Sequence, residues 1–383
     1  MATKLTEKLK DKGYKIDWVP LLFIVIYHVL LLALVPVYFV VATPSLGLLI
    51  GSFLLWMLSL ISITAGYHRL YAHKTYRAKK PVEWVLMFFG TMATQGSVMR
   101  WAHDHRLHHQ HVDSSGDPYG TSKGFWHSHL LWMFKQGPDF EERYLKDLKS
   151  NPAIRFQHKY YGLLMTLTNV AAVVVLGLVT GDWLGAFVIG FLVRLFFVHH
   201  CTWFINSLAH MWGSKPYSSE HSAVNNFILS LLTYGEGYHN YHHTFAGDYR
   251  NGVRWYQFDP PKYLIWFLSK VGLASDLKRT DPLMIKKKLV QADRKLLLDH
   301  LSSVTSFDAS AFAASVEKMS ERLSESIASA KMVMDKYRAL DRKQDKVAKK
   351  ELRVRFRELK QDISQDLKTW RRLCRMILDL RPA

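Results

Sequence analysis

Nine of the nineteen histidines in this chain lie in short clusters with regular spacing. The neutral imidazole ring is a common ligand of iron, zinc and copper. One zinc ion usually takes three or four protein ligands, so nine histidines exceed what a single ion needs. The clusters therefore predict a polyhistidine centre that holds two metal ions. The nine residues are His68, His73, His105, His108, His109, His210, His239, His242 and His243.

Two of the clusters have the pattern HxxHH, at 105–109 and 239–243. Residues three and four apart lie on the same face of a helix, so the histidines of each cluster should converge and can serve two metals. Asn206 and His210 have the same four-residue spacing. We expect the ligands to come from helices that leave a membrane and from the loops between them, which places the metals near the lipid headgroups.

The other ten histidines are assigned ordinary structural roles, because a single histidine is far more often a hydrogen-bonded or surface side chain than a ligand. Of the ten, His103 and His200 are the two strongest candidates for a role at the site. The remaining eight are His28, His111, His127, His129, His158, His199, His221 and His300.

The chain contains apolar segments long enough to cross a membrane. No Lys, Arg, Asp or Glu occurs between Trp18 and Tyr67, a run roughly twice the ~20 residues that one spanning helix needs. This run predicts one helical hairpin, and a similar apolar region after residue 159 predicts a second. The expected spans are about 18–41, 46–66, 160–180 and 183–205. The expected fold class is an all-α membrane protein with four spans in two hairpins and a cytoplasmic helical cap.

The distribution of positive charge predicts the orientation of these spans. Five lysines precede the first span and fourteen lysines or arginines lie between residues 69 and 159, whereas the two tight turns carry none. The positive-inside rule then places both termini and the long connection in the cytoplasm. The first apolar segment is too long for the hydrophobic region of a signal peptide, so we expect the protein to retain it.

Overall charge and cysteine content exclude several classes of site and partner. The formal net charge is +19, and Cys201 and Cys374 are the only cysteines. Two cysteines are too few for a disulfide framework or a cysteine-ligated iron–sulfur cluster. The positive charge lies on the predicted cytoplasmic side, which favours anionic lipids, an acidic protein or a phosphorylated substrate as counterparts rather than nucleic acid.

Composition also divides the chain into segments. Residues 1–17 form a cytoplasmic N-terminal segment, and residues 18–275 form the membrane domain. Residues 283–381 contain no Gly or Pro, and apolar residues recur there at helical spacing in two stripes. This pattern predicts a cytoplasmic helical hairpin or coiled coil, whose simplest role is to pack on itself or on a second copy.

Four segments resemble the histidine boxes of membrane fatty-acyl desaturases, and most of all the stearoyl-CoA, or delta-9, branch. The segments are AGYHRLYAH at 65–73, DHRLHH at 104–109, NSLAH at 206–210 and GEGYHNYHH at 235–243. They occur in the family's order and are separated by membrane hairpins as in the family. The resemblance covers roughly residues 15–275 and does not extend to the tail.

The resemblance implies a di-iron centre within the cytoplasmic cap, above a stem of four membrane helices. It assigns one iron to five histidines and the second to the other four, with Asn206 reaching the second iron through a water molecule. The first set is His68, His73, His105, His109 and His242, and the second is His108, His210, His239 and His243. The implied reaction uses O2 and two electrons to introduce a cis double bond into a saturated acyl chain, at the delta-9 position.

The resemblance also suggests substrate contacts. Trp101, Trp126 and Trp132 flank the second box and are candidates for the wall of an acyl tunnel, although such tryptophans also anchor proteins at membrane interfaces. Trp56 and Leu60 are candidates for the closed end of that tunnel. The animal acyl-CoA pattern differs near the headgroup site, where this chain has Gly96 and His103, with Asp104 retained beside them. Acyl-CoA is the expected substrate, with acyl-carrier protein and phospholipid esters as alternatives.

Electrons must come from another protein. The chain has no glycine-rich dinucleotide fingerprint and no His-Pro-Gly-Gly haem signature, so a ferredoxin, cytochrome b5 or similar acidic donor is expected. Two alternative functions are hydroxylation of a lipid or alkane on the same scaffold, and metal transport or sensing. Transport sites usually lie at membrane depth, which disfavours the latter. A bacterial cytoplasmic membrane is expected in preference to the endoplasmic reticulum.

Overall fold

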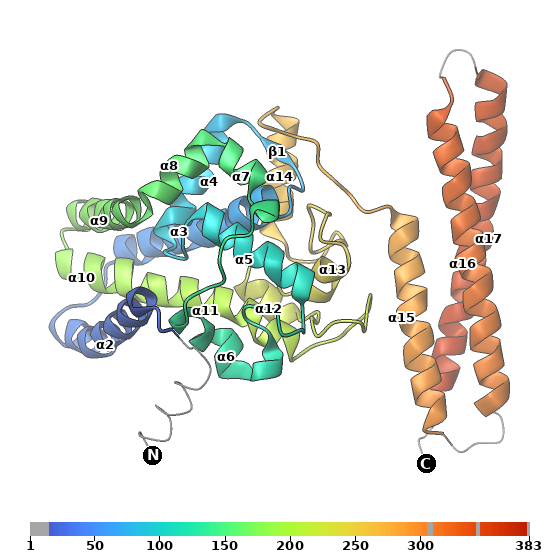
Figure 1. Cartoon of the computed structure of the whole chain (residues 1–383), viewed down its shortest axis with the longest axis horizontal. Coiled ribbons are helices and arrows are strands. Elements are labelled where there is room, and N and C mark those ends of the chain that lie inside the picture. Colours follow the sequence, from blue (N-terminus) through green and yellow to red (C-terminus); the bar gives the residue numbers. More distant parts are fainter. Residues whose placement is uncertain (1–14, 305–308, 342–344, 381–383) are drawn as a thin grey trace. The chain divides into compact units, whose positions relative to one another are not determined.

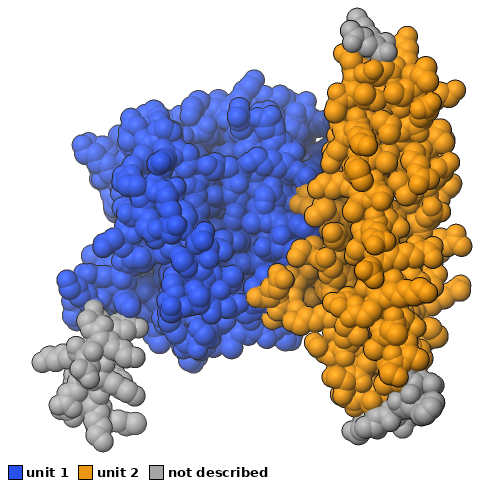
Figure 2. Space-filling model, turned by 45° about the vertical axis from the view of Figure 1, so that its right-hand side comes forward, with its two compact units in different colours: residues 1–214, 221–279 blue, residues 215–220, 280–383 orange. Residues whose placement is uncertain are grey.

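The computed structural model describes residues 15–304, 309–341 and 345–380. Of the predicted segments, residues 1–14 at the N-terminus and residues 305–308, 342–344 and 381 in the tail lie outside the described residues. The chain divides into two compact units (Figure 2). The first comprises Met1–Ser214 and His221–Arg279, and the second comprises Lys215–Glu220 and Thr280–Ala383.

The predicted all-helical membrane fold is confirmed (Figure 1). Among the described residues, four helices are long and apolar enough to span a membrane: α2 (Trp18–Val41), Leu46–Ala72, α9 (Tyr161–Thr180) and Trp183–His210. The second and fourth extend past the expected ends at 66 and 205. The fourth is the most enclosed, with 61% of its apolar window buried against 17% for α2. It therefore lies deepest within the first unit.

Both extended helices contain π-helical turns. The second span consists of α3 (Leu46–Ile61) and a π-helix at Ser62–Ala72. The fourth consists of α10 (Trp183–Phe187), a π-helix at Val188–Val193, α11 (Arg194–Asn206) and a 3₁₀ turn at Leu208–His210. π-Helical turns are rare and often occur at functional sites, and the one at 62–72 contains the first histidine of the first cluster.

The turn between the third and fourth spans is fixed by two adjacent residues. Gly181 ends α9 with a left-handed φ of +72°, which a residue without Cβ adopts readily. The next residue, Asp182, accepts the Gly185 N–H at 2.6 Å and begins α10. Its other oxygen accepts a hydrogen bond from the Tyr38 hydroxyl of α2 at 2.6 Å. This contact joins the first span to the turn.

One buried cation connects the spans. Arg194 is 2% exposed, and its Nε donates to the Gly190 carbonyl at 2.8 Å. Its Nη2 donates to the amide oxygen of Asn169 on α9, and Nη1 has longer contacts to Ser59 and to the Met92 carbonyl. Neutral oxygens from its own helix and from three others therefore surround the guanidinium, as expected for a polar group buried in a membrane bundle.

Shorter elements form the cap around the ends of these spans. They are β1 (Arg77–Ala78), α4 (Lys80–Met92), α5 (Val98–His111), α6 (Phe125–His129), α7 (Lys146–Ser150), α8 (Pro152–Lys159), α12 (Phe227–Leu232), α13 (His239–Thr244), α14 (Pro260–Lys270) and β2 (Ala274–Ser275), with 3₁₀ turns at Thr121–Lys123, Leu131–Phe134 and Glu142–Tyr144. Strands β1 and β2 pair antiparallel. The main hydrophobic core lies where α4 and α5 pack on the π-helix 62–72.

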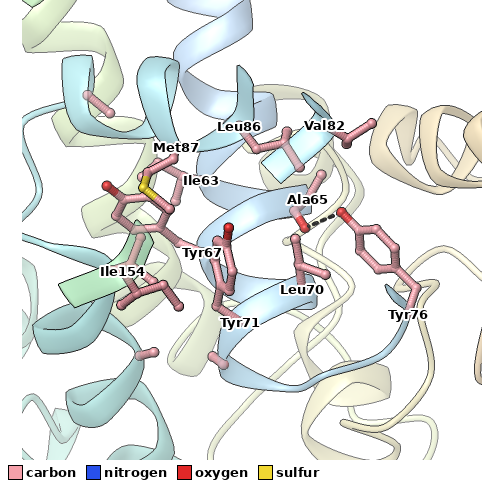
Figure 3. Packing of buried hydrophobic residues seen from close by; sticks show 14 of the residues in the cluster. Ile63, Ala65, Tyr67, Leu70, Tyr71, Tyr76, Val82, Leu86, Met87 and Ile154 are labelled. Carbon is pink, nitrogen blue, oxygen red and sulfur yellow. Dashed lines mark hydrogen bonds between the residues drawn. The ribbon is translucent and has the colours of Figure 1, made fainter. Parts of the chain in front are cut away.

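This core holds the π-helix in place (Figure 3). The Tyr76 hydroxyl donates to the Ala65 carbonyl at 2.8 Å, which satisfies a backbone acceptor of the wide helix. On another side, the Tyr67 ring lies directly against Gly90 of α4, and a Cβ added at position 90 would clash with that ring. A larger residue at 90 would therefore push α4 away from the helix that carries the first histidine cluster.

The tail is a bundle of three helices (Figure 1). Its members are α15 (Pro282–Ser302), α16 (Ala309–Ala339) and α17 (Lys346–Leu378). The two predicted apolar stripes correspond to α16 and α17, and α15 is a third helix that the stripes did not include. Trp370 of α17 is buried among the three, and its Nε1–H donates to Asp293 of α15 at 3.1 Å.

Replacing Arg194 with Ala should lower the stability of the membrane domain by roughly 2 kcal/mol, because buried oxygens on α9 and on the π-helix 188–193 lose their donor. The matched control is Arg77→Ala, which removes an exposed partner of Asp276 and should cost less than about 1 kcal/mol. Thermal unfolding of both variants in the same detergent measures the difference. Equal shifts in melting temperature would contradict this account of Arg194.

Candidate metal centre

The structure gathers the nine clustered histidines into two groups. Within each group, the nitrogens that face one another all lie within 4.8 Å. The first group is His68, His73, His105, His109 and His242, and the second is His108, His210, His239 and His243. All nine predicted residues are thus brought together, in the division that the desaturase resemblance implies.

The π-helix explains how His68 and His73 meet. On a regular α-helix, residues five apart point in different directions. In a π-helix the backbone bonds run between residues five apart, and the His73 N–H donates to the His68 carbonyl at 3.0 Å. The two ring centroids are consequently 4.8 Å apart. The π-helix therefore brings His68 and His73 onto one face, as an α-helix does for the histidines of an HxxHH cluster.

Helices α5 and α13 each contribute to both groups. On α5, His105 and His109 face the first group, while His108 faces the second. On α13 the division is reversed, because His242 belongs to the first group and the other two histidines to the second. The rings of His109 and His243 stack across the boundary with centroids 4.2 Å apart. The two groups are therefore immediate neighbours.

Distances between the ring nitrogens fit shared metal ions. Within the first group, Nε2 of His242 lies 3.0 Å from His68 and 2.9 Å from His109. Within the second, Nε2 of His239 lies 3.1 Å from both His210 and His243. Two nitrogens bound to the same metal ion, each at about 2.0–2.1 Å, lie roughly 3 Å from one another. The donor set can therefore hold one ion in each group.

Polar partners outside the groups orient several of the rings. Nδ1 of His68 lies 3.0 Å from Glu236, and Nδ1 of His108 lies 2.9 Å from Asp117. A carboxylate only accepts, so the His108 ring donates from Nδ1 and keeps the lone pair of Nε2 for its group, whereas the His68 ring lies at ion-pair distance from Glu236. Nδ1 of His210 similarly contacts the Ser222 hydroxyl at 2.7 Å. Asp117 thus selects the tautomer of His108 that a metal requires.

Glu236 also belongs to a buried ionic network. It lies 3.1 Å from Arg69, which in turn pairs with Asp259 at 2.9 Å. Burial alone would raise the pKa of Glu236, but the interactions with His68 and Arg69 outweigh burial and lower this pKa to about 2. The carboxylate is therefore ionised at neutral pH and can stabilise positive charge on the first group.

Several of these histidines are held in the neutral form. Burial lowers the pKa of His105, His109 and His242 well below its usual range, and neighbouring imidazoles lower it further. Burial, with His108 beside it, lowers the pKa of His239 to about 3. Neutral imidazole is the form that binds a metal, so these rings need not lose a proton first.

A cavity of about 340 Å³ reaches both groups. His68 and His105 of the first group and His239 of the second form part of its wall, and most of its surface is apolar. Asn206, the last residue of α11, also lines this cavity but belongs to neither histidine group. An apolar chain inside the cavity would lie against both groups.

The candidate substrate residues divide into two sets. Trp101, Asp104 and Trp132 line the cavity, and the Trp101 ring stacks on His105 with centroids 4.9 Å apart. Four others lie outside the lining, namely Trp56, Leu60, His103 and Trp126. Trp126 is 66% exposed, and His103 is buried with Nδ1 bonded to Asp104 at 2.9 Å. His103 therefore contacts Asp104, which lines the cavity, and does not line the cavity itself.

Several wall and support residues were not found from the sequence. Gln95 and Thr202 line the cavity and are joined by a hydrogen bond of 2.8 Å. Glu236 precedes His239 by three residues, so its place within the fourth box was a usable signal. Asp117 lies nine residues after His108 in an irregular segment, and no spacing rule points to it.

Some of the remaining histidines form a separate chain of contacts. Nε2 of His28 lies 3.2 Å from His200, whose Nδ1 lies 3.1 Å from His129. None of the three belongs to the two groups. His199 bonds the Tyr27 hydroxyl at 3.1 Å. These histidines have hydrogen-bonding partners of the ordinary structural kind.

The fold and site define a helical membrane protein with two adjoining histidine groups that can each hold a metal ion. The sequence model of the fatty acid desaturase family matches residues 43–265. The chain belongs to the fatty acid desaturase family. The tail beyond α14 lies outside the matched region.

Curated relatives agree with this assignment. The chain is 42% identical over 270 residues to a probable acyl-CoA desaturase of Schizosaccharomyces pombe, covering 70% of this chain and 56% of the relative. It is 41% identical over 238 residues to acyl-CoA desaturase 1 of Saccharomyces cerevisiae, covering 61% and 47%. It is 34% identical over 271 residues to an sn-1 stearoyl-lipid 9-desaturase of Anabaena variabilis, covering 70% and 96%. The chain thus spans about half the length of the two yeast relatives.

The carboxylates behind the two groups allow each group to be tested separately. Glu236→Gln should weaken metal binding at the first group, and Asp117→Asn at the second, by about 10–100-fold each. Elemental analysis after anaerobic loading with Fe²⁺ should show metal content falling from two ions toward one per chain in either variant. Glu142→Gln, which changes an exposed carboxylate, serves as the control. Unchanged metal content in both variants would contradict the proposed orienting role.

Proposed function

We propose that this protein is an iron-dependent acyl desaturase that introduces a cis double bond into a saturated acyl thioester. The proposal rests chiefly on the apolar cavity whose wall includes histidines of both groups. In the balanced reaction, one –CH2–CH2– unit loses two hydrogens and O2 takes up these, two electrons and two protons to form two molecules of water. An unactivated methylene has no acidic proton, so acid–base groups alone cannot perform this step.

In this proposal each histidine group would hold one iron ion, and Asn206 would reach the second ion through a water molecule. Iron supplies the oxidising power that removes hydrogen from an unactivated carbon. The chain's own residues supply position. Trp101 stacks on His105 and lines the cavity, so it would confine the acyl chain beside the first group.

An acyl-CoA is the proposed substrate class. The cavity lining includes charged residues, among them Arg100, Asp104 and Lys135. Arg100 is held by Asp104 at 2.8 Å and by the Pro138 carbonyl at 2.8 Å, so its charge is kept in place for a phosphate-bearing head group. The two yeast relatives are named as acyl-CoA desaturases, whereas the cyanobacterial one is named for a lipid-linked substrate. A lipid ester is therefore the alternative substrate.

The proposed delta-9 position rests on the resemblance of the histidine boxes to the stearoyl-CoA branch. Methylenes are chemically alike, so the site of reaction must depend on the distance between the bound head group and the metals. On the second span, Trp56, Leu60 and Thr64 recur at four-residue intervals, and Thr64 already lines the cavity. We infer that Leu60 and Trp56 close the path of the acyl chain beyond Thr64.

The remaining proposals concern setting and partners. Electrons come from a separate acidic donor, such as a ferredoxin or a cytochrome b5, because O2 reduction requires two electrons that the acyl chain does not supply. Both termini are proposed to be cytoplasmic, from the distribution of Lys and Arg. A bacterial cytoplasmic membrane is the proposed location, and the relatives include both yeast and cyanobacterial proteins.

Product analysis tests the proposed reaction. Expression in a desaturase-deficient host should yield new cis-monounsaturated acids, detected by gas chromatography with mass spectrometry, with the double bond at position 9 after derivatisation. His239→Ala should abolish them, because it removes a ligand of the second group. His300→Ala, in the tail, should retain them. Hydroxylated lipids in place of alkenes, or no new product with a competent donor present, would overturn the proposal.

Chain-length preference tests the proposed closed end. Trp56→Ala should shift the products toward longer acids by several-fold, because shortening this side chain leaves space beyond Thr64 for further methylenes. Trp84→Ala, which changes a half-exposed tryptophan on α4, is the matched control and should leave the profile unaltered. An unaltered profile in Trp56→Ala would exclude this residue as the limit on chain length.

A further inference from the structure

Helix α17 of the tail carries a regular series of positive charges. Eight lysines and arginines recur at intervals of three or four residues, interrupted only by Ser364. They are Lys346, Lys350, Arg353, Arg357, Lys360, Lys368, Arg371 and Arg375, and all eight are exposed. At 3.6 residues per turn they lie within an arc of about 80° and extend about 44 Å along the helix. We call this surface the basic stripe.

Packing of the tail does not require the basic stripe. The side of α17 that enters the bundle is apolar, with Ile363, Trp370 and Ile377 buried. The acidic residues of α17 lie on another flank, where Glu358 pairs with Arg355 at 3.4 Å. Among the described residues, no ion pair involves a member of the stripe. The fold therefore leaves these charges available on the surface.

Repulsion between the charges of the stripe lowers the stability of α17. Like charges three and four residues apart repel one another, whereas alternating signs would stabilise an isolated helix. A further cation adds to the field, because Lys286 of α15 lies close to Lys360 and Arg371, and burial together with their charges lowers the pKa of Lys286. Repulsion along the stripe is relieved when an anionic surface covers it.

We propose that the basic stripe lies on the surface of a bilayer that contains anionic phospholipid. The stripe is long, straight and evenly charged, which fits a plane of headgroups better than a single bound molecule. The apolar side of α17 is occupied within the bundle, so attraction is through charge and not through insertion of the helix. This is an additional interaction surface, outside the region that matches the desaturase family.

The connectivity of the chain favours a bilayer as the occupant. In the part of the chain that the structure describes, no candidate span follows Trp183–His210, so the tail lies on the membrane side to which that helix leads. The tail begins at Pro282, soon after the membrane domain ends, so the bilayer surface remains at high local concentration. An acidic protein or a nucleic acid would instead have to be recruited from solution.

Lysine footprinting of the full chain in nanodiscs tests the proposal. One set of discs contains phosphatidylcholine alone, and the other contains about a third phosphatidylglycerol. Acetylation of Lys346, Lys350, Lys360 and Lys368, quantified by mass spectrometry, should slow by about threefold or more in the anionic discs and recover at about 0.5 M salt. The exposed lysines of α16, Lys318, Lys331 and Lys336, should react equally in both discs.

A pair of double variants separates the stripe from general positive charge. Arg353→Gln with Arg357→Gln removes two charges of the stripe and should reduce the protection of its lysines to about half or less. Arg338→Gln with Arg355→Gln removes two exposed arginines outside the stripe and should leave the protection of the stripe lysines unchanged. Helical circular dichroism confirms folding of both.

Three results would overturn the proposal. The first is equal acetylation of the stripe lysines in neutral and anionic discs. The second is equal loss of protection in the two double variants. The third is protection that appears only after an acidic protein or a nucleic acid is added, which would assign the stripe to that partner instead of the lipid surface.

Discussion

Convergence of nine imidazoles on two adjoining points is the constraint on which the rest of the molecule depends. Burial favours the uncharged form of an imidazole, and a buried ring aims its lone pair correctly only when its other nitrogen has a fixed partner. Glu236 and Asp117 supply such partners to His68 and His108. The cap can therefore be understood as the structure that excludes water from the rings and fixes their outer hydrogen bonds.

The support around the first group links parts of the chain that are far apart in sequence. Arg69, next to a histidine on the π-helix, pairs with Glu236 just before α13 and with Asp259, which caps α14. Because all three charges are buried, removing one would leave the others without compensation. One ionic network thus couples the end of the second span to the helix that contributes to both histidine groups.

The two units of the chain accommodate their charged residues in different ways. The membrane unit buries the charge of Arg194 against neutral oxygens and pairs Arg69 with Glu236 and Asp259 beside the site. The tail is a conventional amphipathic bundle around Trp370, with charge on its surface. The family match covers most of the first unit, whereas the basic stripe of α17 belongs to the second, so a lipid-facing role of the tail would be an addition to the desaturase scaffold.

Features that depend on local pattern were predictable from the sequence, including the four spans, the helical tail and the set of nine histidines. The length of an apolar run and a three- or four-residue spacing are properties of neighbouring residues, so they can be read from the sequence without knowledge of distant contacts. Four features were not predictable in this way. They are the π-helix at 62–72, the pairing of Asp117 with His108, the place of Trp101 rather than Trp126 in the cavity wall, and the third tail helix. Each depends on packing between segments distant in sequence, such as α4 against the second span, and such packing emerges only when the chain is folded.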